Sequence, residues 1–341
     1  MTDLLEVRGL QTHFASERGV VRAVDGVSLR LERGRTLGIV GESGCGKSVT
    51  ALSIMGLVPQ PPGRIAAGEV RFEGEDLLHA PAQRLRDLRG DQLSMIFQEP
   101  MTSLNPAFQV GEQIAEVIVR HKNVSQSEAK NRSIEMLRKV RIPSPEARAK
   151  EYPHQLSGGM RQRVMIAMAL ACDPRLLIAD EPTTALDVTI QAQILELMRS
   201  AVVERDTALI LITHDLGVVA GMAQTINVMY AGHIVERAET DELYGRPRHP
   251  YTVGLLQSIP RLDAQGRGEL VPIQGQPPDL SRQIGGCPFA PRCFNVQERC
   301  RQENPALEQA PDAADGHEVA CWYPAEGETL VPSGFEAERA S

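Results

Sequence analysis

Residues 41–48 read Gly-Glu-Ser-Gly-Cys-Gly-Lys-Ser, a complete match to the phosphate-binding pattern G-x-x-x-x-G-K-S. The apolar run Thr36–Val40 before it predicts a strand, and a helical pattern over Lys47–Leu57 follows it. Glycines let backbone N–H groups turn inward around an anion, and the helix N-terminus adds positive potential. We predict that Lys47 contacts the β- and γ-phosphates of ATP and that Ser48 is a ligand of Mg²⁺. The candidate ATP contacts of this loop are Gly41, Ser43, Gly44, Cys45, Gly46, Lys47, Ser48 and Val49.

A second motif is the apolar run Leu176–Ala179, which predicts a strand and ends in two carboxylates, Asp180 and Glu181. Such a strand carries its last residues to the carboxyl edge of an open α/β sheet, where ligands bind beside the phosphate loop. We predict that Asp180 holds Mg²⁺ and that Glu181 is catalytic, polarising the water that attacks the phosphate.

The periodicity of the chain predicts an α/β fold built on a mostly parallel sheet, with an antiparallel lobe at its start. Between residues 106 and 155 strand signals give way to amphipathic helical patterns over Val110–His121 and Ser127–Val140. We therefore expect a domain over residues 1–240, with a helical subdomain at about 104–168, and an irregular extension over 241–341. Beyond those at the two motifs, the expected strands are Leu4–Leu10, Val27–Leu31, Leu93–Phe97, Leu209–Thr213 and Thr225–Tyr230.

A third motif, Leu156–Arg163, reads Leu-Ser-Gly-Gly-Met-Arg-Gln-Arg and precedes a long apolar helical pattern. Ser157 is expected to cap that helix, while Gly158 and Gly159 leave backbone N–H groups open to a phosphate. The run resembles the LSGGQ signature of ATP-binding-cassette (ABC) ATPases, with Met160 where many members have Gln. The resemblance implies a P-loop ABC ATPase core, and a pair of cassettes in which the signature residues complete the ATP site of the opposite chain.

Other positions match this family one by one, and their roles are what the resemblance implies. Gln98 resembles the Q-loop glutamine, which senses Mg²⁺ and water and faces the membrane partner. Ala185–Asp187 resembles the D-loop, so that Asp187 belongs to the nucleotide site. His214 resembles the switch histidine that contacts the γ-phosphate, and Phe14 the aromatic residue that stacks on adenine.

The resemblance narrows to the oligopeptide/dipeptide importer subfamily through Ser157–Leu197, through His249–Thr252 (His-Pro-Tyr-Thr), and through the cysteine-containing run Cys287–Trp322. It implies an ATP-hydrolysing subunit that energises peptide import from the cytoplasmic face of the inner membrane, as a peripheral protein. The implied partners are a second homologous cassette (in a heterodimer or a homodimer), two transmembrane permease subunits and, indirectly, a periplasmic or lipoprotein solute-binding protein. Nickel or glutathione import, and a soluble ABC ATPase that serves no transporter, stay open as alternatives.

Four of the six cysteines fall in one window with the spacing C-x5-C-x6-C-x20-C. Disulfides are not expected, because the chain shows no export signal and the cytosol keeps thiols reduced. Four thiolates suit either a 4Fe-4S cluster or structural Zn²⁺, and the gaps are longer than those of common zinc knuckles. The subfamily resemblance favours the 4Fe-4S cluster. The expected ligands are Cys287, Cys293, Cys300 and Cys321.

The composition excludes several classes of protein. The chain has 341 residues and a net charge of -8, and residues 262–341 hold 13 acidic against 6 basic residues. The nearly neutral remainder has no basic excess, which argues against a nucleic-acid partner. No apolar run reaches the roughly 18 residues of a membrane span. The N-terminus lacks the charged and apolar regions of a signal peptide.

Overall fold

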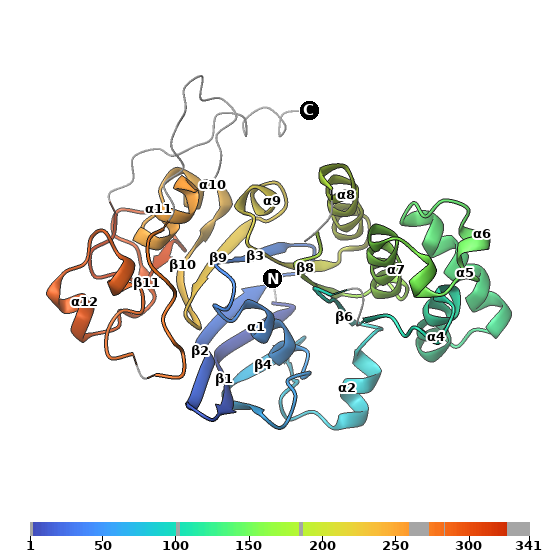
Figure 1. Ribbon diagram of the computed structural model, residues 1–341, viewed down its shortest axis with the longest axis horizontal. Helices are drawn as coiled ribbons and strands as arrows, with labels where there is room; N and C mark the ends of the chain where they lie inside the picture. The colour runs from blue at the N-terminus through green and yellow to red at the C-terminus, as the bar shows by residue number, and fades with distance from the viewer. Residues whose placement is uncertain (1–2, 100–102, 184–186, 259–272, 283, 326–341) are drawn as a thin grey trace, which may run out of the picture.

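The computed structural model describes residues 3–99, 103–183, 187–258, 273–282 and 284–325. Within these residues the strands form two sheets, an eight-stranded mixed sheet and a four-stranded antiparallel sheet (Figure 1). The strand order of the mixed sheet is β11-β12-β10-β9-β3-β8-β7-β6. The prediction of an α/β fold with a mixed sheet and an antiparallel lobe is confirmed.

Five strands of the mixed sheet run parallel, from β9 across to β6. All five residues of β3 and all five of β7 are buried, as expected where helices or other layers cover both faces of a parallel sheet. The bounds are β3 (Thr36–Val40), β6 (Leu93–Ile96), β7 (Leu176–Asp180), β8 (Ala208–Thr213), β9 (Thr225–Tyr230) and, antiparallel to β9, β10 (His233–Glu239).

The antiparallel sheet has the order β2-β1-β4-β5. Its first two strands extend well beyond the runs Leu4–Leu10 and Val27–Leu31 that the sequence predicts. The reason is that register shifts interrupt β1 between Val7 and Gln11, and these break the alternation by which a strand is recognised. The bounds are β1 (Leu5–Ser16), β2 (Gly19–Leu31), β4 (Gly63–Phe72) and β5 (Glu75–Asp76).

Helices replace strands between β6 and β7, as the sequence predicts, and they gather on one side of the molecule (Figure 1). These helices are α4 (Val110–Lys122), α5 (Gln126–Lys139), α6 (Pro145–Arg148) and α7 (Gly158–Leu170). Around the sheets lie α1 (Lys47–Ile54), α2 (Ala82–Leu88), α8 (Val188–Arg205) and α9 (Leu216–Ala220). In the described residues, no helix is long and apolar enough to cross a membrane.

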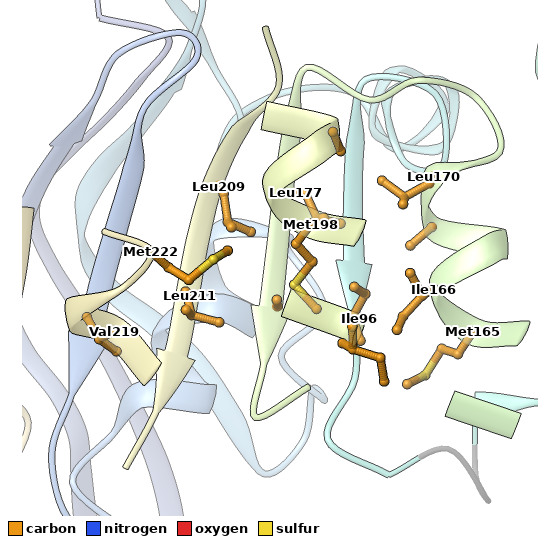
Figure 2. Close-up of a cluster of buried hydrophobic side chains, with 14 of the residues drawn as sticks. Ile96, Met165, Ile166, Leu170, Leu177, Met198, Leu209, Leu211, Val219 and Met222 are labelled. Atoms are coloured by element: carbon orange, nitrogen blue, oxygen red, sulfur yellow. The ribbon is translucent and has the colours of Figure 1, made fainter. Parts of the chain in front are cut away.

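The mixed sheet separates two buried apolar clusters. Leu177, Leu209 and Leu211 belong to the cluster that also contains Met198 of α8 and Ile166 of α7, and Figure 2 shows these side chains between strand and helix. Their neighbours along the same strands belong to the other cluster, with residues of α1 and of the antiparallel sheet. This alternation follows from the two-residue period of a strand, and it fixes α1 on one face and α7 and α8 on the other.

The C-terminal extension contains short regular elements that the sequence pattern did not reveal. Elements of two to eight residues are too short to show a clear period. The strand β12 pairs with β10 through Glu236–Val319 and Arg237–Glu318, so the extension continues the mixed sheet. The elements are α10 (Thr240–Gly245), α11 (Pro250–Gln257), a 3-10 helix (Ala290–Arg292), α12 (Glu298–Gln302), β11 (Glu308–Gln309) and β12 (Glu318–Val319).

Candidate active site

The phosphate-binding loop connects β3 to α1, in the arrangement that the sequence predicts. Gly41 has a φ of 154° and Gly46 a φ of 107°, in the region that favours glycine. A Cβ atom on Gly46 would lie 2.1 Å from the carbonyl oxygen of Ala23, and one on Gly41 would lie 2.2 Å from that of Met229. Backbone conformation and close packing therefore both require glycine here, which leaves the loop's interior open to a ligand.

Lys47 is the first residue of α1, and its side chain extends back to the start of the P-loop. The residue is only 4% exposed. Its Nζ donates hydrogen bonds to the carbonyl oxygens of Gly41 at 2.8 Å and Glu42 at 3.1 Å. The ammonium group thus lies at the mouth of the loop, where a phosphate can replace these carbonyls as its partner.

Ser48 and Asp180 come together although 132 residues separate them. The Ser48 hydroxyl donates to Asp180 Oδ1 at 3.0 Å, because α1 packs beside the end of β7. Burial raises the pKa of Asp180, and the hydrogen bond from Ser48 opposes that shift. An adjacent hydroxyl and carboxylate are oxygen ligands of the kind that Mg²⁺ prefers.

Glu181 lies between two other predicted site residues. Gln98 Nε2 donates to Glu181 Oε2 at 3.2 Å, and His214 Nδ1 lies 3.5 Å from Glu181 Oε1. The Glu181 side chain is 8% exposed, whereas that of His214 is 58% exposed. The ends of β6, β7 and β8 therefore bring Gln98, Glu181 and His214 to one edge of the sheet, beside the P-loop.

The signature residues lie on a different part of the molecule from the P-loop. Ser157 and Gly158 are exposed at the N-terminus of α7, which packs against α4 and α5 (Figure 1). The Ser157 hydroxyl accepts a hydrogen bond from Met160 N–H at 3.4 Å, as expected for an N-cap. Ser157 and Gly158 are thus exposed at the start of α7, whereas Lys47 begins α1.

Two further predicted site residues, Asp187 and Phe14, lie at the start of α8 and on β1. Asp187 is the exposed N-cap of α8 and accepts from Ile190 N–H at 2.9 Å. The preceding D-loop residues, 184–186, lie outside the described residues. Phe14 is half-buried on β1, where it pairs with Val21 of β2 and Gly63 of β4.

The four cysteines of the C-terminal extension line one small pocket, which His249 and Phe289 also line. Burial raises the pKa of Cys287 and Cys293, and raises that of Cys321 to about 12. Among the residues that the structure describes, no group of three or more His, Cys, Asp or Glu side chains is arranged to hold a metal ion. The sequence spacing thus correctly groups four thiols, but they do not converge on one point. They are Cys287, Cys293, Cys300 and Cys321.

Sequence reasoning missed two side chains of the extension that contact the P-loop. Arg292 forms a two-pronged ion pair with Glu42, with Nη1–Oε2 at 2.5 Å and Nη2–Oε1 at 2.9 Å. Tyr251 Oη accepts a hydrogen bond from Glu42 N–H at 2.8 Å. The hydrogen bonds to Glu42 raise the pKa of Arg292. Sequence separations of 250 and 209 residues carry no local signal for these contacts.

Comparison with known proteins agrees with this geometry. The family model of the ABC transporter matches residues 24–184, and that of the oligopeptide/dipeptide transporter C-terminal region matches residues 235–300. The chain is 52% identical to the oligopeptide transport ATP-binding protein OppD of Bacillus subtilis (strain 168), over 94% of this chain and 89% of the relative. It is 51% identical to the dipeptide transport ATP-binding protein DppD of the same organism, over 94% of this chain and 95% of the relative.

Solved structures show the same fold. The dimeric post-hydrolysis structure of the ATP-binding cassette MJ0796 bound to ADP and Pi matches with a TM-score of 0.63 and 26% identity. That match covers 69% of this chain and 98% of the cassette. CbiO1 from Clostridium perfringens, part of the ABC transporter complex cbiONQ, matches with a TM-score of 0.59, over 72% of this chain and 91% of that chain.

Proposed function

The chain belongs to the ABC transporter family, among its oligopeptide and dipeptide transport ATP-binding proteins, and from this premise we propose that it hydrolyses ATP to drive the import of peptides. The observation that carries the proposal is the position of Glu181, a buried carboxylate between Gln98 and His214 and adjacent to Asp180. A carboxylate so placed can accept a proton from an attacking water, while its neighbours fix its orientation.

Hydrolysis at this site depends on positioning and on stabilisation of charge. Lys47, whose ammonium group already lies at the loop, exchanges its carbonyl partners for the β- and γ-phosphates of ATP. Glu181 orients the water for in-line attack, and His214, which is more exposed, contacts the γ-phosphate. The Phe14 ring is the proposed stacking partner of adenine.

Ser48 and Asp180 fit a magnesium ion, because their oxygen atoms are already within 3.0 Å of each other. Gln98, which hydrogen-bonds Glu181, is the third residue proposed to contact it. When bound, Mg²⁺ neutralises charge that develops on the phosphate oxygens. Without the ion, the Asp180 carboxylate would repel a bound triphosphate, so a chelator should slow hydrolysis.

The exposed signature supports a dimer with composite ATP sites. Ser157 and Gly159 lie at a helix N-terminus, a favourable position for a phosphate, yet they belong to a different lobe from the P-loop. We assign them to the nucleotide of a second cassette, in a heterodimer or a homodimer. Asp187, exposed at the N-terminus of α8, lies at the same interface in this arrangement.

The helical subdomain, which contains α4 to α7, is the proposed docking surface for two transmembrane permease subunits. Phe108 lies two residues before the start of α4 and is 53% exposed, so it offers an aromatic contact to a partner protein. Contact here places the protein at the cytoplasmic face of the inner membrane as a peripheral subunit. A periplasmic or lipoprotein solute-binding protein then acts through the permeases.

We further propose that the cysteine pocket holds a 4Fe-4S cluster rather than Zn²⁺. The spacing C-x5-C-x6-C-x20-C has longer gaps than the closely spaced cysteine pairs of common zinc sites. A cluster places an inorganic core between its thiolates, which suits four thiols spread around one pocket. Ligation requires deprotonation, so the raised pKa of Cys321 means that binding releases protons.

Anaerobic purification tests this assignment. We expect iron and sulfide in equal amounts, with visible absorbance that Cys300→Ser removes, and Cys172→Ser, a buried cysteine outside the pocket, is the control. If the protein holds one zinc per chain and no iron, the site is a zinc site. If it holds no metal and four titratable thiols, both assignments are wrong.

Reconstitution with the permeases tests the transport function. We expect peptides to stimulate ATP hydrolysis by the complex more than nickel chelates or glutathione do. If only nickel chelates or only glutathione stimulated hydrolysis, that compound would be assigned as the substrate instead of peptides. Failure of the chain to co-purify with any polytopic membrane protein would instead favour a soluble ABC ATPase.

A further inference from the structure

Glu42, the second residue of the P-loop, is held from three directions. Its carboxylate pairs with Arg292, its N–H donates to Tyr251, and its carbonyl oxygen accepts from Lys47. Two of these partners belong to the C-terminal extension and the third is the predicted phosphate-binding lysine. Glu42 therefore links the extension directly to the residue that must move when ATP binds.

Arg292 is itself rigidly held, so it can fix the position of its partner. Its side chain is 4% exposed, Nε donates to the carbonyl oxygen of Gln274 at 3.0 Å, and Nη1 donates to Tyr230 Oη at 3.3 Å. Tyr230 packs against Tyr251, with ring centroids 4.7 Å apart. The two side chains of the extension that contact Glu42, Arg292 and Tyr251, thus both contact Tyr230.

The charge of Glu42 explains why such a partner is needed. A carboxylate in the P-loop lies close to the bound triphosphate and repels it unless a cation neutralises the carboxylate. Lys47 is required for the phosphates, so it cannot serve this purpose. The Arg292 guanidinium forms a bidentate ion pair, with one hydrogen bond to each carboxylate oxygen of Glu42.

Arg292 is also part of the segment that forms the cysteine pocket. It is the last residue of the 3-10 helix Ala290–Arg292, between Cys287 and Cys293. Ala290 N–H donates to the Cys287 carbonyl oxygen at 3.0 Å, and Cys293 N–H donates to that of Ala290 at 3.4 Å. A change in the pocket's backbone is therefore transmitted to Arg292 over a single turn.

We propose that Arg292 is a positioning residue for ATP: it neutralises Glu42 and holds the P-loop from the C-terminal extension, so that nucleotide affinity depends on the fold of that extension. The proposal rests on the proposed role of the P-loop as the ATP site, and it adds a cation from outside the cassette to that site.

A double-mutant cycle on the full chain tests it, with ATP affinity measured by titration with a fluorescent ATP analogue. We expect Arg292→Gln to weaken binding about tenfold, because it leaves the Glu42 carboxylate unpaired beside the phosphates. Glu42→Gln should weaken binding less than about threefold, since it removes the repulsion together with the pair. The double variant should bind about as well as Glu42→Gln alone.

Three further variants complete the design. Arg292→Lys should bind ATP more tightly than Arg292→Gln, because an ammonium group still neutralises Glu42 although it cannot form a bidentate ion pair. Tyr251→Phe keeps the aromatic packing but removes the acceptor for Glu42 N–H, and should also weaken ATP binding. Arg282→Gln, which removes an exposed ion pair with Asp279 inside the extension, is the matched control and should change nothing.

The outcomes separate the possibilities. An affinity for Arg292→Gln equal to that of Arg282→Gln overturns the proposal. So does a loss in Arg292→Gln that Glu42→Gln does not relieve, because a purely structural role for Arg292 is indifferent to the charge at residue 42. If the parent chain binds no ATP at all, it is the proposed ATP site that fails.

Discussion

Glu181 is the residue on which the proposed hydrolysis most directly depends. It adopts a positive φ of 46°, which directs the chain sharply away from β7 and leaves the carboxylate between Gln98 and His214. Strained backbone of this kind persists where the surroundings hold it, and here Glu181 N–H donates to the carbonyl oxygen of Ile212 at 2.8 Å. Position and burial together suit this side chain to act on a water molecule.

At this residue we predict that Glu181→Gln retains ATP but hydrolyses it at least about a hundredfold more slowly, because the amide cannot accept a proton. Phosphate release in a single turnover, beside equilibrium ATP binding, measures the two effects separately. Glu204→Gln, an exposed change at the end of α8, is the control. Unchanged phosphate release in Glu181→Gln would remove Glu181 from the mechanism.

The sequence singles out residues that lie together in the structure where chemistry imposes a local pattern. The P-loop, the paired carboxylates and His214 each follow a strand, and the sheet brings them together. Glu42 shows the limit of such reasoning, because its partners Tyr251 and Arg292 lie more than 200 residues away. A distant ion pair obeys no spacing rule, and only the folded extension brings Arg292 to the loop.

Among the elements, α7 has an N-terminus that is exposed to solvent. Its N-terminus presents Ser157 and Gly158 to solvent, although a helix N-terminus with open N–H groups is a favourable anion site. Its other end is buried against the sheet through Ile166 and Leu170 (Figure 2). The helix is therefore anchored by its apolar side chains, while its polar end remains free for a second cassette.

At this element we predict that Ser157→Asp leaves ATP binding by the variant chain intact but slows hydrolysis by the assembled complex at least tenfold. Aspartate still caps α7 but places a negative charge against the γ-phosphate of the opposite site. Ser125→Asp, at the N-cap of α5, is the matched control. Turnover of the complex at the parental rate would contradict composite sites.

The sequence predicts the fully buried parallel strands and the amphipathic helices α4 and α5. It does not predict β4, β10 or the short elements of the extension. The strand β10 mixes buried apolar and charged residues, and its buried Glu236 reads as polar surface unless its partners are known. Long-range pairing, not local propensity, makes it a strand.

At the scale of the whole molecule, the C-terminal extension joins the mixed sheet around Glu236 of β10. This fully buried carboxylate accepts hydrogen bonds from His249 N–H at 3.0 Å and lies 2.8 Å from His317 Nε2. Burial lowers the pKa of His249 to about 4, below its ordinary value of 6.5, although Glu236 opposes the shift. His249 is thus neutral in the folded chain over a range in which the unfolded chain takes up a proton.

We predict that the free energy of unfolding falls between pH 6.5 and about 4, because there the unfolded state binds a proton at His249 that the folded state does not. The full effect of this residue is roughly 3 kcal/mol. Burial also lowers the pKa of His233, which adds to the slope. Urea unfolding at several pH values measures the total.

His249→Asn isolates the contribution of His249, since asparagine caps α11 but does not titrate, and should flatten the profile. The exposed His154→Asn should leave the profile unchanged. Parallel profiles for the parent and His249→Asn would show that His249 contributes nothing to acid sensitivity.

The pairing of β12 with β10 has a consequence for the solubility of the chain. Without β12, the outer edge of β10 would present unpaired N–H and C=O groups, and such an edge can recruit strands of other molecules. A chain shortened to residues 1–240 would keep the ATP motifs but expose this edge, and it would be prone to aggregate. The C-terminal extension therefore also protects the chain from self-association by covering this edge.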